Sequence, residues 1–180
     1  MVAKSSKYPG LPSPITCFAR LYFICAGWVL RRAINDLKRK HSQRSIAKSP
    51  LIVADRLDRS AIEAALRRLE TSDFFSFSLV RRYVKTIAVF PYPIRRGFLI
   101  GAVFLTEGFR ANISEERLAA FFVRYAVQAR MLLDFHIYSM ICYERRCRRL
   151  SYLVELRCME QIGCSCEEIQ EQESFIQRVS

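Results

Sequence analysis

Five cysteines and one histidine in the second half of the chain are the side chains best suited to bind a metal ion. They are Cys142, Cys147, Cys158, Cys164, Cys166 and His136. The paired short spacings typical of zinc sites are missing, and a separation of five does not bring two thiols to one face of a helix. We therefore expect no metal site. The odd total of seven Cys favours reduced, buried thiols in an intracellular protein. Cys164-Ser165-Cys166 is the part to check for redox reactivity.

The sequence contains no pattern that predicts an enzyme active site. The two histidines are His41 and His136, and no Ser nucleophile elbow, phosphate-binding loop or Gly-rich nucleotide fingerprint is present. The glycines are scattered, and Gly97 and Gly101 are interpreted as positions of close packing. We expect a protein that is not an enzyme, with no catalytic residues and no cofactor.

A cluster of arginines interleaved with Tyr143 and Tyr152 could bind a polyanion such as RNA. It consists of Arg145, Arg146, Arg148 and Arg149. Basic helical faces that carry aromatic side chains can hold a phosphate backbone. A solvated surface is the alternative interpretation, since Glu144 and Glu155 flank the cluster. The net charge of +12 favours polyanionic partners such as nucleic acid, anionic lipid or an acidic protein, and its excess lies mainly in residues 1–50, where ten Lys/Arg stand against Asp36 alone.

Helices are expected to position these side chains. The chain is 51% apolar with only 6 Gly and 6 Pro, which leaves long uninterrupted stretches and favours helices over a turn-rich β protein. The predicted fold is all-α: a single-domain helical bundle with an apolar central helix. We divide it into an irregular N-terminal arm (1–14), the bundle (15–166, with a basic linker at 38–50 within it) and a Glu/Gln-rich tail (167–180) that forms a weak helix or frays.

The first half of the bundle leaves two segments open. A first helix is expected over about 15–37, and its apolar part, Ile15–Leu30, either packs on the core or serves as a membrane-associated or targeting segment. A second helix is expected over Ala61–Leu69 with Ser60 as its cap. Phe74–Phe90 is compatible with helix or strand.

The second half is more clearly helical. After a short buried element at Phe98–Leu105, Ser114 is expected to cap a helix with two Glu in its first turn, where the helix dipole favours them. No Gly or Pro occurs from there to Ile162. This predicts one very long helix, or two helices with a joint near Asp134–His136. Gly163 supplies the stop.

The segment Phe109–Phe122 resembles the first homology region of the Bcl family of apoptosis regulators. That region reads Phe-Arg, a short polar turn, an aliphatic residue, Asn-Trp-Gly-Arg, then aliphatic residues ending Ala-Phe-Phe. The chain keeps Phe109, Arg110, Ile113, Arg117, Leu118, Ala120, Phe121 and Phe122 without a gap. Upstream, Ser72-Asp73-Phe74-Phe75 is similar to the end of the family's death helix. Downstream, Gln161-Ile162-Gly163 falls where the second Gly-containing region begins.

The resemblance implies a groove that takes an amphipathic helix of a partner protein. Arg117 would be the ionic anchor for an Asp of the partner. The apolar lining implied by the resemblance is Leu118, Phe121, Phe122, Phe109 and Ile113. Glu116 stands where the family has the Gly that lets the partner helix approach. The implied function is the regulation of cell death by a divergent, viral-type member that is cytoplasmic or associated with mitochondria.

Two other functions remain open. One is a basic helical RNA-binding or silencing-suppressor-type protein that uses Arg145–Arg149. The other is an accessory subunit of a mitochondrial assembly. In such an assembly the basic N-terminal segment would be buried against RNA or protein. An anionic membrane surface is a further candidate partner of the chain. A steep dependence of binding on salt would favour the RNA-binding function.

Overall fold

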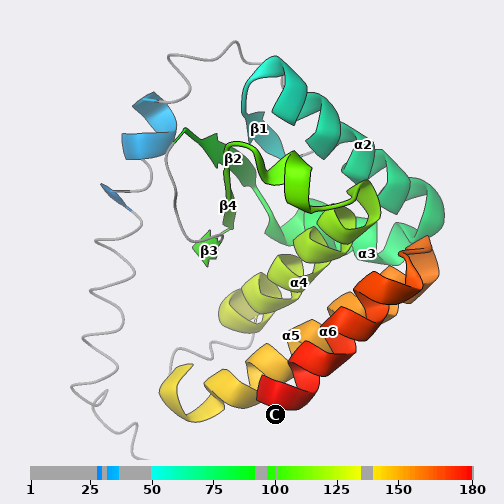
Figure 1. Cartoon of the computed structure of the whole chain (residues 1–180). Helices are drawn as coiled ribbons and strands as arrows, with labels where there is room; N and C mark the ends of the chain where they lie inside the picture. Colours follow the sequence, from blue (N-terminus) through cyan, green and yellow to red (C-terminus); the bar gives the residue numbers. More distant parts are fainter. Residues whose placement is uncertain are drawn as a thin grey trace, which may run out of the picture.

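The computed structural model describes residues 28–29, 32–36, 50–91, 97–99, 101–134 and 140–179. For residues 97–99, 132, 140–146 and 179 it describes the backbone alone. The chain is predominantly helical and bundle-like around an apolar central helix, as predicted, and a small sheet accompanies the helices (Figure 1). The predicted arm at 1–14 lies outside the described residues. So does the predicted linker, apart from Pro50, and most of the predicted first helix.

The sheet has four short strands. They are β1 (Leu51–Val53), β2 (Thr86–Phe90), β3 (Gly97–Leu99) and β4 (Ala102–Thr106), in the order β1-β2-β4-β3. β1, β2 and β4 are parallel, and β3 runs antiparallel to β4. Gly101 lies between β3 and β4 with φ of 81°, a left-handed conformation that glycine adopts without strain. These strands were not assigned from the sequence. Phe74–Phe90, for which helix and strand were both left open, contains α3 followed by β2, and the short element expected at Phe98–Leu105 is the β3–β4 hairpin.

Side chains alternate between the two faces of the sheet, as the period of two along a strand requires. The face toward the helices carries Ile52, Ile87, Val89, Val103 and Leu105, which belong to the main core. The other face carries Val53, Ala88, Phe90 and Ala102, which form a second cluster with Ile34. Helices α2 to α6 therefore lie on one side of the sheet and the helical residues 32–36 on the other (Figure 1).

Two consecutive helices connect β1 to β2. They are α2 (Arg56–Ser72) and α3 (Phe74–Tyr83). The cap of α2 is Asp55, whose carboxylate accepts a hydrogen bond from the Asp58 amide at 2.7 Å; the prediction of Ser60 as the cap was wrong because the helix begins one turn earlier. Asp73 separates the helices. Its N–H donates to the Leu69 carbonyl of α2, and its carboxylate accepts from the Ser76 amide of α3.

The remaining helices follow the 3₁₀ turn η1 (Phe109–Asn112). They are α4 (Glu115–Asp134), α5 (Met140–Ile162) and α6 (Cys166–Val179). The predicted cap of α4 is confirmed, since Ser114 Oγ accepts from the Arg117 amide at 3.1 Å. Two helices rather than one very long helix span 115–162. The predicted stop is confirmed as well: α5 ends at Ile162, and Gly163 has φ of 82°.

The predicted tail is an ordered helix that belongs to the domain. In α6, Gln172 and Ile176 are buried, and Phe175 packs against Tyr152 of α5 with ring centroids 4.9 Å apart. Residues 172 and 176 are one turn apart on the same helix face, which is the period of a helix that packs on another. Although α6 is rich in Glu and Gln, the narrow buried stripe formed by Gln172 and Ile176 holds it on the domain.

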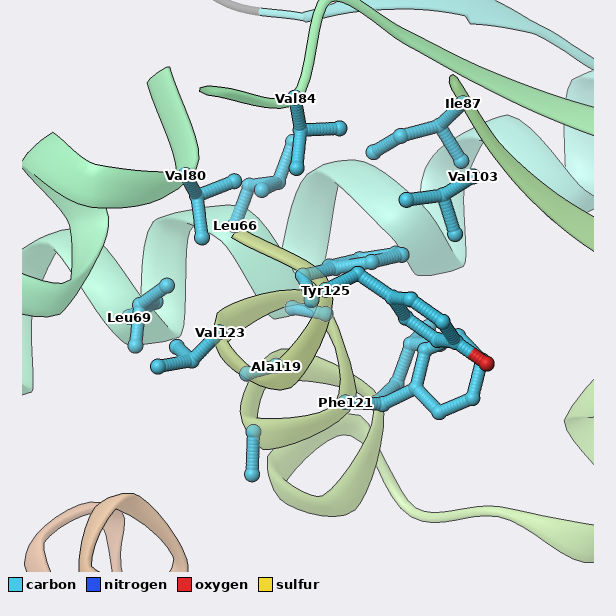
Figure 2. Packing of buried hydrophobic residues seen from close by; sticks show 14 of the residues in the cluster. Leu66, Leu69, Val80, Val84, Ile87, Val103, Ala119, Phe121, Val123 and Tyr125 are labelled. Carbon is cyan, nitrogen blue, oxygen red and sulfur yellow. The ribbon is translucent and has the colours of Figure 1, made fainter. Parts of the chain in front are cut away.

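The main core is centred on α4. Side chains of α2, α3, β2 and β4 converge on α4: in Figure 2, Leu69 lies beside Val123, and Ile87 and Val103 lie on the side of Tyr125 and Phe121. Ala119, Ala120, Ala126 and Ala129 are fully buried in the same helix, and such small side chains let neighbouring elements approach closely. No helix in the described part of the chain is long and apolar enough to cross a bilayer.

Candidate functional site

A cleft of about 450 Å³ lies between α4, α5 and α6, with Asn112 of η1 and Ile113 also in its wall. It is lined by Asn112, Ile113, Arg117, Phe121, Arg124, Tyr125, Tyr152, Glu155, Glu171 and Gln172. A second hollow of about 200 Å³ shares five of these residues and extends to Phe175 and Arg178 of α6. The lining combines aromatic faces with charged groups, as binding pockets commonly do.

A buried ion pair forms the base of the cleft. Arg124 Nη1 of α4 lies 3.0 Å from Glu155 Oε2 of α5, and the two side chains are only 14% and 5% exposed. Gln172 Nε2 of α6 donates to the same carboxylate oxygen at 2.9 Å. Three helices thus meet at one carboxylate, and each contact satisfies a polar group that would be costly to bury alone.

Three aromatic rings surround the Arg124 guanidinium. Its central carbon lies 4.7 Å from the ring centroid of Phe121, 4.8 Å from that of Tyr125 and 4.9 Å from that of Tyr152. The faces of aromatic rings attract cations, most strongly where water is excluded. Arg124 Nη2 also donates to the Tyr125 hydroxyl at 3.2 Å. The guanidinium is therefore held by a carboxylate, a hydroxyl and an aromatic cage.

Burial and charge act in opposite directions on this pair. Burial raises the pKa of Glu155 above its usual value, although Arg124 and the hydrogen bond from Gln172 both favour the carboxylate. Burial also works against the charge of Arg124, but Glu155 and the two tyrosines outweigh it, so the pKa of Arg124 is raised. The guanidinium of Arg124 stays charged at any physiological pH, and its charge stabilises the ionised form of Glu155.

Arg117 forms the rim of the cleft. Its Nη1 lies 2.5 Å from Glu171 Oε2 of α6, with side-chain exposures of 27% for Arg117 and 61% for Glu171. About one turn earlier on each helix, Ser114 Oγ donates to Glu168 Oε1 at 2.7 Å. The contacts of α4 with α6 at the rim are therefore polar and more exposed, in contrast to the buried pair below them.

The cleft divides the residues that the resemblance implied. Ile113, Arg117 and Phe121 line it. Phe109, Leu118 and Phe122 do not: they are at most 2% exposed and belong to the main core, together with side chains of α2, α3 and the sheet. These three side chains stabilise the domain from inside. We assign them to the core instead of a contact surface.

The arginine cluster lies on α5, away from the cleft lining. Arg148 and Arg149 are exposed, while the side chains of Arg145 and Arg146 are not among those that the structure describes. Glu116, which stands where the resemblance has a Gly, lies 3.7 Å from Arg68 of α2 and does not line the cleft.

The cysteines include two buried thiols. Cys158 and Cys164 are 1% and 9% exposed, and burial raises the pKa of each thiol to about 12. Cys166 is exposed, and these three and Cys147 are free. Among the residues that the structure describes, no group of three or more His, Cys, Asp or Glu side chains could hold a metal ion.

The residues at the base of the cleft were missed by the reasoning from sequence. Arg124, Tyr125 and Gln172 were not singled out, and Glu155 was noted only as a charge beside the arginine cluster. Arg124 did carry a signal: it is the one charged residue between Leu118 and Gln128, a stretch that is otherwise apolar. A lone charge inside a buried helix needs a partner, but the sequence does not say which residue provides it.

No family model, curated protein or solved structure matches this chain. Two observations bear on the function: the geometry of the cleft and the resemblance within Phe109–Phe122.

Proposed function

We propose that this chain binds a helical segment of a partner protein in the cleft between α4, α5 and α6, and that it thereby regulates cell death. The observation that carries the proposal is the convergence of Ile113, Arg117 and Phe121 on one cleft. The resemblance implies that these three residues contact the partner. Ile113 lies just before α4, and Arg117 and Phe121 lie on α4.

Arg117 is suited to anchor a carboxylate of the partner. In the free protein its guanidinium is paired with Glu171, a residue whose side chain is 61% exposed. Exposed ion pairs contribute little to stability, about 0–1 kcal/mol, so Glu171 can be displaced at small cost. An Asp on the partner helix would then take its place and form a charge-assisted hydrogen bond.

The wall below Arg117 carries aromatic rings around the Arg124 guanidinium, and their edges are the apolar part of the cleft. Phe121 and Tyr125 lie edge to face with centroids 4.7 Å apart, and Tyr152 stands across the cleft on α5. A volume of about 450 Å³ is enough for one or two large side chains of a bound helix, not for the helix itself. We therefore expect one or two apolar anchors, one turn from the Asp, to dominate the affinity.

The biological setting follows from the resemblance. It implies partners that promote cell death and a site of action in the cytoplasm or at mitochondria. The pairing of Glu116 with Arg68 is compatible with an approaching helix, since it directs this acidic side chain toward α2.

The test is fluorescence-polarisation binding of labelled death-promoting helices to the wild type and to the Arg117→Ala variant. We expect the variant to weaken binding by about 1.5–3 kcal/mol, the range for charge-assisted pairs. Glu171→Ala should strengthen binding or leave it unchanged, because it removes the internal competitor. Arg148→Ala is the matched control: it removes an exposed Arg that does not line the cleft and should have no effect.

Two results would count against the proposal. One is a folded wild type that binds none of the helices. The other is binding that Arg117→Ala does not weaken. A labelled RNA duplex is measured in parallel, and RNA binding that falls steeply with salt and with Arg148→Ala would favour the nucleic-acid alternative instead.

A further inference from the structure

The outer face of α5 carries leucines and arginines side by side. Leu150 and Leu153 are 49% and 43% exposed, and Arg149 and Arg157 are exposed on the same helix. Leu153 lies four residues after Arg149 and four before Arg157, and Leu150 lies three before Leu153. Side chains three and four residues apart are neighbours on a helix surface. These four side chains therefore form one continuous strip, which we call the α5 strip.

The α5 strip lies opposite the face by which α5 packs on the domain. That packed face carries Ser151, Glu155, Cys158 and Met159, which are at most 4% exposed. No residue of the strip lines the cleft or the smaller hollow beside it. The strip is thus the convex outer surface of a helix and takes no part in the cleft.

The surface charge of this part of α5 is positive. Exposed arginines occur at three of its positions: Arg148, Arg149 and Arg157. The one acidic residue between Arg148 and Arg157 is Glu155, whose side chain is 5% exposed and lies 3.0 Å from Arg124. Glu155 therefore offsets the buried charge of Arg124 and not the charge of the outer face. The next acidic residue, Glu160, follows the strip.

We propose that the α5 strip docks on the surface of an anionic lipid bilayer. Leucines that project from a helix face can enter the boundary between headgroups and acyl chains, and basic residues beside them are attracted to acidic headgroups. The apolar stem of an arginine lies along the same boundary while its guanidinium reaches the headgroups. The strip supplies apolar area and positive charge on one helix face, the two contributions on which such binding depends.

Charge and shape favour a bilayer over other occupants. A second copy of this chain on the same strip would bring Arg149 and Arg157 close to further arginines, and like charges oppose such a contact. A nucleic acid would pair with the arginines but gain little from the leucines, because its phosphate contacts are electrostatic. A protein partner usually fills a pocket with a large side chain. The two hollows of the described residues involve Tyr152 and Glu155 of α5, not the strip.

This inference goes beyond the proposed function and does not depend on it, since the strip and the cleft share no residue. Residues 1–50 carry ten Lys/Arg and can attract acidic headgroups as well. Substitutions on α5, and not vesicle binding by itself, therefore test the proposal.

The experiment measures co-sedimentation of the full chain with vesicles of phosphatidylcholine and phosphatidylserine at low salt, and with vesicles of phosphatidylcholine alone. We expect binding to the mixed vesicles only. The L150S/L153S variant should bind them more weakly on the order of tenfold, because the apolar contact is lost. The R149Q/R157Q variant should bind more weakly by about fivefold for each arginine replaced.

The matched controls are L57S and R67Q on α2. Leu57 is 62% exposed and the side chain of Arg67 is 73% exposed, so each control removes an exposed side chain of the same type outside the strip. Both controls should bind the mixed vesicles as the wild type does. Far-ultraviolet circular dichroism checks that each variant is folded.

Three results overturn the proposal: a folded wild type that does not bind the mixed vesicles, binding that either folded α5 variant leaves unchanged, or controls that weaken it equally. Should L150S/L153S not fold, R149Q/R157Q decides, because glutamine at these exposed positions leaves the core intact. A labelled RNA duplex is measured in parallel. RNA binding that R149Q/R157Q weakens, together with vesicle binding indifferent to L150S/L153S, would identify a nucleic-acid surface instead and overturn the proposal as well.

Discussion

Removal of the Arg124 guanidinium is the most informative perturbation of the cleft. In Arg124→Met the apolar stem remains to pack against the aromatic cage, but Glu155 keeps only its hydrogen bond from Gln172. Removal of one partner of a buried ion pair costs about 3–5 kcal/mol, because a buried charge is left uncompensated. For a chain of this length that corresponds to a fall in melting temperature of roughly 6–20 °C.

The double variant Arg124→Met with Glu155→Gln separates charge from packing. The second substitution keeps the shape of the Glu155 side chain and an oxygen that can accept the hydrogen bond from Gln172, but it removes the charge. We therefore expect the double variant to be more stable than Arg124→Met alone. This order is possible only if the uncompensated carboxylate, rather than lost packing, dominates the cost of the single substitution.

The pH dependence of Arg124→Met has a definite sign. Burial already raises the pKa of Glu155, and the loss of Arg124 removes the largest opposing influence. A carboxyl whose folded-state pKa is raised stabilises the fold while it is protonated, and that stability is lost as the pH rises through the folded-state pKa. The deficit of Arg124→Met relative to the wild type should therefore be smaller at about pH 5 than at about pH 8.

The assay is urea unfolding followed by far-ultraviolet circular dichroism at both pH values. Glu171→Ala serves as the control from the same cleft, and it should cost less than about 1 kcal/mol, since its pair with Arg117 is exposed. The reasoning is refuted if Arg124→Met costs less than about 1 kcal/mol, or if the double variant is less stable than the single one.

The remaining predictions concern the thiols and the glycine turns. Cys166 should react with iodoacetamide in the native state, whereas Cys158 and Cys164 should react only on unfolding, as checked by site-resolved mass spectrometry; rapid native labelling of either buried thiol would contradict their burial. In the folded protein the pKa of both buried thiols is about 12, against about 9 in the unfolded chain, so the unfolded chain loses these protons first as the pH rises. The free energy of unfolding, measured by urea titration, should therefore fall above about pH 9, and it should fall less in a C158A/C164A variant. An equal fall in the two proteins would mean that other groups cause it. Gly101→Ala should destabilise the protein more than Gly108→Ala in thermal unfolding, because both have φ near 80° but only at Gly101 would a Cβ meet a backbone oxygen, that of Tyr83 at 3.3 Å; equal costs would mean that φ alone decides.

The helical half of the fold could be predicted because its signals are local. Ser114 and Gly163 act within one turn of the helices they begin and end, and the absence of Gly and Pro between them is visible in the sequence. The strands could not be assigned in the same way. β2 is buried on both faces, so Thr86–Phe90 is a continuous, mostly apolar run, and such a run has no period that separates strand from helix.

The cleft was less accessible to prediction because its contacts are distant in the sequence. Arg124 and Glu155 are 31 residues apart, and Glu155 and Gln172 a further 17. Arg117 was predicted from the resemblance, but its partner Glu171 lies in the tail that was expected to be a weak helix or to fray. A sequence pattern predicts which face of a helix is buried; it does not predict which charged residue of another helix will lie opposite.

Asp73 makes the junction of α2 and α3 sensitive to insertions. One residue both ends the first helix and begins the second, so no spare residue exists to absorb a change in length. Each residue of an α-helix turns the chain by about 100°. A single insertion after Asp73 would therefore rotate α3 about its own axis by more than a quarter turn. Phe77 and Val80 would turn from buried to half-buried positions, and the exposed Phe75 would turn into the buried position that Ser76 holds. Natural variation in this protein should therefore change the residues at this junction but preserve their number.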